Sequence, residues 1–134
     1  DYSNAQLIER GVEVPRRTPI EAGEILATVA ARHSFTLYEY FLTDTAGHAQ
    51  DFPRARIILK DLAELVRTVL TKTDLTQTTV ILTSDHGNVE DLSVRNHTLS
   101  RVPTLIWGAG RDVAARRIRD LADITPAIVS LLTE

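Results

Sequence analysis

Amphipathic helical patterns alternate with short apolar runs along this chain, and that alternation limits its fold more than any other feature. Residues 19–32 and 52–71 repeat apolar side chains at spacings of three and four, which predicts two helices that each bury one face. Residues 35–43, 78–84 and 101–107 are short runs rich in branched, aromatic and other apolar residues, which predict strands. Strands separated by helices favour an α/β fold with a mainly parallel sheet flanked by helices.

Local signals indicate where the helices begin. Residues 18–21 read Thr-Pro-Ile-Glu, a capping box with proline at the first helical position, so the threonine and glutamate side chains can bind free N–H groups of the first turn. Asp51 is the expected cap of the second helix. Residues 125–126, Thr-Pro, are expected to open a last helix, and residues 113–118 form a candidate edge strand before it.

Length and composition fit a single globular domain, so residues 1–134 are expected to share one core. Hydrophobic residues make up 43% and charged residues 25%, which excludes disordered and collagen-like classes. No apolar run approaches the roughly 20 residues that span a bilayer, and a net charge of -3 offers no broad basic surface for nucleic acid. We therefore expect no membrane and no nucleic-acid partner, and a cytoplasmic location.

The chain contains neither cysteine nor methionine. Without cysteine, a metal site has to use His, Asp or Glu. Without methionine, and with Asp1 as its first residue, the chain is expected to be the C-terminal part of a larger domain. Residues 1–18, which include an irregular stretch with a proline, are then expected to be the connector from the upstream part.

Three of the four histidines lie in short polar stretches beside carboxylates. Asp44 and His48 are four residues apart, Asp85 and His86 follow a predicted strand, and His97 ends the loop that this second pair begins. Both aspartates sit at the carboxyl ends of predicted strands, where α/β sheets hold their ligands. Imidazole and carboxylate groups suit zinc and manganese. Each pair taken alone is more often ordinary turn chemistry than a ligand set, since Asp and Gly are common turn residues.

Several segments carry residue types whose order and spacing form a specific pattern. The segments are Thr43 to His48, Thr83 to Glu90, His97-Thr98, Val102-Pro103 and Asp123 to Pro126. They resemble the metal-binding segments of the alkaline phosphatase superfamily, most closely its cofactor-independent phosphoglycerate mutase and phosphopentomutase branch. The resemblance covers about residues 35–132 and implies the C-terminal part of a three-layer, alkaline-phosphatase-like fold.

The resemblance also implies a ligand set and a reaction class. It assigns Asp44, His48 and His97 to one divalent ion and Asp85 and His86 to a second, with manganese or zinc as the metals. Two ions about 3.5–4 Å apart can clamp an in-line phosphoryl displacement. The chain is then the metal-binding part of a phosphomutase or phosphatase whose substrate is a phosphorylated small molecule.

A nucleophile is missing from this set. The superfamily takes a Ser or Thr nucleophile and a further Asp from the first strand and loop of its sheet, whereas Ser3 and Thr18 lie in helix-cap contexts here. We therefore assign no catalytic residue, expect the nucleophile upstream of residue 1, and expect the chain alone to be inactive. Apolar surface left open by the missing half is expected to favour self-association.

Two other functions stay open. One is a hydrolase of the same superfamily that acts on a phosphodiester, sulfate or phosphonate; the other is a non-catalytic metal-binding or interaction domain. Only ten residues separate His86 from His97, fewer than in the mutases, and no sugar-phosphate-binding domain is visible, so mutase activity itself is open. Glu90 and Asp91 are either groups that orient a ligand imidazole or solvated loop acids.

Overall fold

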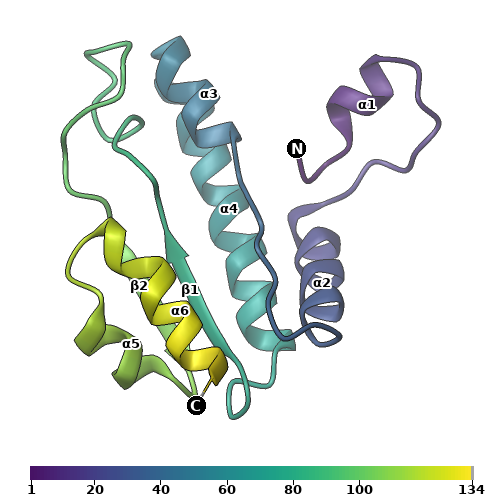
Figure 1. Ribbon diagram of the computed structural model, residues 1–134. Coiled ribbons are helices and arrows are strands. Elements are labelled where there is room, and N and C mark those ends of the chain that lie inside the picture. The colour runs from purple at the N-terminus through teal and green to yellow at the C-terminus, as the bar shows by residue number, and fades with distance from the viewer. Residues whose placement is uncertain (134) are drawn as a thin grey trace.

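The computed structural model describes residues 1–133 and contains both helices and strands, as predicted (Figure 1). The helices are α1 (Ala5–Glu9), α2 (Pro19–Ala30), α3 (Leu42–Ala49), α4 (Phe52–Lys72), α5 (Arg111–Arg117) and α6 (Ile124–Thr133), with a 3-10 turn η1 (Leu121–Asp123) before α6. The strands are β1 (Thr79–Thr83) and β2 (Thr104–Gly108). None of the helices in this described part combines the length and apolar character needed to cross a bilayer.

The helix pair α2 and α4 forms one side of the structure, and both helices begin where the sequence predicts. Thr18 and Glu21 form the complete capping box of α2, and the Asp51 carboxylate accepts the N–H of Arg54 at the start of α4. The helices approach closely at Gly23, where a Cβ atom would lie 2.9 Å from the Leu65 carbonyl oxygen. Glycine is therefore required by this helix crossing.

The two strands pair antiparallel, from Thr79 opposite Gly108 to Thr83 opposite Thr104. The parallel pairing expected for this sheet is wrong for these strands. A parallel neighbour requires a crossover connection, and residues 84–103 between the strands contain no helix, so the chain simply turns back beside itself. The loop at 84–103 consequently starts and ends at the same edge of the sheet.

The strand predicted at residues 35–43 is also wrong. Residues 35–41 are extended but irregular, and within the described chain the backbone groups of residues 35–40 make no backbone hydrogen bond. A strand needs a partner, and β1 is paired with β2 instead. The segment is held by Tyr40, whose ring stacks on Tyr2 at 6.0 Å, while Leu37 stays 72% exposed.

The C-terminal region differs from its prediction at 113–118: residues 113–117 belong to helix α5 and Ile118 caps it, so no edge strand forms here. Fully buried Ala114 packs this helix into the structure, α5 lies against β2, and α6 lies against α5. The last helix occurs as predicted, although its start is set by Asp120 and Asp123 in a capping box around η1 and not by Thr125.

Candidate metal centre

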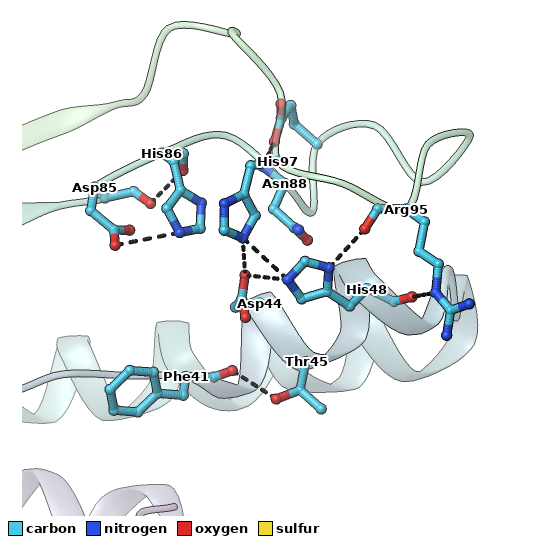
Figure 2. Close-up of polar contacts among 11 residues, drawn as sticks. Phe41, Asp44, Thr45, His48, Asp85, His86, Asn88, Arg95 and His97 are labelled. Atoms are coloured by element: carbon cyan, nitrogen blue, oxygen red, sulfur yellow. Dashed lines mark hydrogen bonds and ion pairs between the residues drawn. The ribbon is translucent and has the colours of Figure 1, made fainter.

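Helix α3 and the loop at 84–103 bring the predicted ligands together (Figure 2). Asp44 therefore lies in the first turn of α3 and not at a strand end, and His48 follows four residues later on the same face of the helix. The loop is closed by a bridge in which the Thr98 N–H donates to the Gly87 carbonyl oxygen at 2.9 Å. This bridge places His97 beside His86.

Three donor atoms form a nearly equilateral triangle. Oδ1 of Asp44 lies 3.3 Å from Nε2 of His48 and 3.2 Å from Nε2 of His97, and the two nitrogen atoms are 3.1 Å apart. Ligands bound to one zinc or similar ion at about 2.0–2.2 Å are separated by roughly 3.0–3.6 Å. The side chains remain 36%, 42% and 47% exposed in the same order, so an ion can reach them from solvent.

The tautomer of His48 is fixed by the backbone of Arg95. The Arg95 carbonyl oxygen only accepts, so His48 Nδ1 donates to it at 2.7 Å, and Arg95 Nε returns a hydrogen bond to the His48 carbonyl oxygen at 3.2 Å. In the neutral ring, Nε2 therefore carries the lone pair that faces the triangle. A lone pair is what a metal ligand must present.

The hydrogen bond between the two Nε2 atoms of the triangle leaves the aspartate oxygen without a partner in residues 1–133. Asp44 Oδ1 is buried and has no hydrogen-bond partner among the described residues, although two imidazole nitrogens lie within 3.3 Å. A carboxylate oxygen facing an imidazole lone pair is unfavourable unless a cation lies between them. The donor set and this orphaned oxygen fit a divalent ion.

His86 extends the cluster and Asp85 stands at its rim. The His86 ring stacks on His97 with centroids 3.5 Å apart and an interplanar angle of 16°. Potential ligand atoms of Asp44, His86 and His97 lie within 4.8 Å of one another, so this set and the triangle share two residues. We favour the triangle as one binding site because its three distances are all shorter. Asp85 lies 3.4 Å from His86 Nε2 and its side chain is 84% exposed.

Glu90 clamps the loop that carries the histidines. One of its carboxylate oxygens accepts the backbone N–H of Asn88 at 2.6 Å, and the other accepts the Thr98 hydroxyl. Hydrogen bonding, first from Thr98 and then from the Asn88 backbone, lowers the pKa of Glu90. Glu90 thus joins Asn88 to Thr98 across the loop beside His97, whereas the Asp91 carboxylate accepts hydrogen bonds from Ser93, two residues away.

Acidification is expected to open this clamp. Because the folded pKa of Glu90 lies below its ordinary value of 4.5, its carboxylate stabilises the closed loop at neutral pH, and this contribution is lost as the pH falls through the folded pKa. An NMR titration should show the Asn88 and Thr98 amide resonances shifting together at that step. The same step in a Glu90→Gln variant would contradict the clamp.

Sequence reasoning missed two contributors to this site. The Arg95 carbonyl that accepts from His48 is a backbone group and leaves no trace in residue type. Asn88, only 6% exposed, packs against Gly47 of α3, where a Cβ would lie 1.2 Å from the Asn88 Oδ1. The glycine before His48 was the available signal, since it marks a close approach of another segment to the helix.

Comparison with known proteins places this site in context. The chain shares 26% identity with a protein of Ehrlichia canis (strain Jake) over 75% of this chain and 21% of that protein, and 26% with one of Sulfurimonas denitrificans over 90% and 26%. A Desulforudis audaxviator protein shares 27% over 88% and 24%. All three carry the name 2,3-bisphosphoglycerate-independent phosphoglycerate mutase. The chain therefore spans about a quarter of the length of these curated relatives, and no solved structure matches it.

A family model also matches most of the chain. A model described as Metalloenzyme superfamily covers residues 20–133, which include every predicted ligand. The family resemblance found in the sequence motifs is confirmed by this match together with the mutase relatives. Membership implies divalent metal binding, which the Asp and His cluster on α3 and the loop suits. This chain belongs to the Metalloenzyme superfamily.

Proposed function

We propose that this chain is the metal-binding part of a divalent-metal-dependent enzyme that transfers or hydrolyses phosphoryl groups, of the phosphomutase or phosphatase type. The observation that carries the proposal is the triangle of donor atoms from Asp44, His48 and His97, all within 3.3 Å of one another. The phosphoglycerate mutase name of the relatives supports the reaction class.

In this proposal the triangle holds the first ion, and Asp85 and His86 hold the second, with manganese or zinc as the metals. When bound, such ions neutralise charge on phosphate oxygens and activate a nucleophile. The chain's own residues hold and orient the ligand side chains. The Arg95 carbonyl keeps the His48 lone pair directed at the triangle, and Glu90 keeps the His97 loop closed.

We further propose that other parts of the catalytic domain lie outside these 134 residues. No Ser or Thr here has the sequence context of the family's nucleophile, so a separate segment supplies it, with residues 1–18 as the connector and a larger three-layer sheet as the complete fold. The chain alone is then inactive on its phosphorylated small-molecule substrate in the cytoplasm. Exposed Phe35, Leu37 and Phe41 support self-association through the apolar surface that the separate segment would cover.

Metal titration tests the proposal directly. The chain should bind Mn²⁺ or Zn²⁺ in isothermal titration calorimetry, and His97→Ala should weaken binding by at least about 10–100-fold because it removes one of three ligands. His33→Ala is the matched control, since His33 is exposed beyond the end of α2 and outside the cluster. Equal affinities of the parent and His97→Ala would refute the assignment and favour an interaction domain.

A further inference from the structure

Asn88 is a buried polar residue whose side chain is left without partners. It is 6% exposed, and neither Oδ1 nor Nδ2 of its amide finds a hydrogen bond within the described structure. Its backbone N–H, by contrast, is bound to Glu90. A buried amide without hydrogen bonds is destabilising, so such a group indicates that a ligand completes the site.

The Asn88 amide lies on the ligand-bearing face of α3. Gly47 is three residues after Asp44 and directly before His48, and residues three and four apart share a helix face. A Cβ atom on Gly47 would lie 1.2 Å from Asn88 Oδ1, so this amide occupies the space that a side chain of residue 47 would fill. Figure 2 draws it beside His97 and above the His48 ring. The unpartnered group therefore borders the triangle.

The chemistry of the amide complements that of the triangle. The triangle presents a carboxylate oxygen and the lone pair of His48 Nε2 beside the Nε2 of His97, a donor set that suits a cation. A phosphate attached to that cation brings anionic oxygens that accept hydrogen bonds. A carboxamide supplies two N–H donors without adding a charge that would compete with the metal. Asn88 can thus bind the anion while the triangle binds the ion.

We propose that Asn88 donates a hydrogen bond to an oxygen of a phosphate bound at the Asp44, His48 and His97 ion. This inference rests on the proposed function and adds to it a residue that contacts the phosphoryl group. Asn88 is then a substrate-binding residue, and its space is created by the absence of a side chain at Gly47. The clamp by Glu90 holds its backbone in place for that contact.

The test measures metal and phosphate binding separately on the full 134-residue chain. Mn²⁺ affinity is measured by calorimetry, and binding of inorganic phosphate to the Mn²⁺-loaded chain is measured by calorimetry and by the paramagnetic broadening of the phosphate phosphorus NMR signal. Asn88→Ala removes the donors, and Asn88→Asp replaces them with an anion of nearly the same shape. Asn96→Asp is the matched control, because Asn96 is exposed in the same loop.

We expect Asn88→Ala to keep Mn²⁺ affinity within about threefold and to weaken phosphate binding by about 10–100-fold, the usual effect of losing a hydrogen bond to a charged group. Asn88→Asp should weaken phosphate binding further through repulsion, and Asn96→Asp should bind phosphate like the parent. A purely structural role would lower the melting temperature in both Asn88 variants without this ranking of phosphate affinities.

Each other outcome has a definite meaning. Phosphate affinity unchanged in Asn88→Ala, or reduced only in step with Mn²⁺ affinity, overturns the role of Asn88 and leaves the proposed function standing. A Mn²⁺-loaded parent that binds no phosphate overturns the inference as well. A parent that binds no Mn²⁺ overturns the proposed function, and the inference with it.

Discussion

Replacing Asp44 with asparagine is expected to lower phosphoryl-transfer turnover by about 100–1,000-fold when the chain is joined to a segment that supplies the nucleophile. Oδ1 of Asp44 lies 3.2–3.3 Å from two imidazole nitrogens and belongs to both overlapping ligand sets. Asparagine keeps the shape of the side chain and removes the only formal negative charge of the triangle. Turnover of a phosphate monoester at saturating Mn²⁺ is the measurement.

Asp112→Asn is the control for this change, because Asp112 is 73% exposed and forms its ion pair with neighbouring Arg111, away from the triangle. A second readout needs only the chain itself. Mn²⁺ at 100 times its dissociation constant stabilises a one-site protein by about 2.7 kcal/mol, so the parent should melt higher with the ion present. An Asp44→Asn variant that retains both this shift and full turnover would exclude Asp44 as a ligand.

Gly47→Ala is expected to destabilise the chain by about 1–3 kcal/mol and to weaken metal binding, although alanine is the better helix former. The added methyl group would lie 1.2 Å from Asn88 Oδ1 and 2.4 Å from its Cγ. Gly47 is buried in α3 beside fully buried Ala46, so the helix cannot simply turn the methyl group outward. Thermal unfolding with and without Mn²⁺ measures both effects.

A double variant separates this clash from other causes. If the methyl group destabilises by meeting the Asn88 amide, then Gly47→Ala in an Asn88→Ala background should recover most of the lost stability, as a coupling energy in a double-mutant cycle. Additive losses in the double variant would place the cause elsewhere on α3. A single Gly47→Ala variant as stable as the parent would show that Asn88 moves aside freely.

Local interactions explain what was predictable in the fold. The capping box at residues 18–21 and the Asp51 cap act within one helical turn, so the starts of α2 and α4 follow from sequence. The run at 78–84 contains β1, and the run at 101–107 contains β2 except for its last residue, Gly108. Residues 35–41 have equal strand character, but a strand also needs a pairing partner. No residue pattern reveals that β1 pairs with β2 and not with this segment.

The candidate site shows the same division between local and distant causes. A spacing of four residues brings the Asp44 and His48 side chains together on a helix as it can on a turn. The pair was therefore predictable although its secondary structure was not. The neighbours of His97 depend on how the loop at 84–103 closes. That closure uses a backbone bridge and the Glu90 carboxylate, whose role only became clear from its contacts with Asn88 and Thr98.

The contact between His48 and His97 joins two points that are 49 residues apart in sequence. An ion shared by them would act as a removable cross-link between α3 and the loop. In the unfolded chain, holding such distant points together is entropically costly, so the ion binds the folded arrangement selectively and reinforces it. Chelators would then loosen the α3 and loop unit before the α2 and α4 pair, which makes metal supply a control on local rigidity as well as on chemistry.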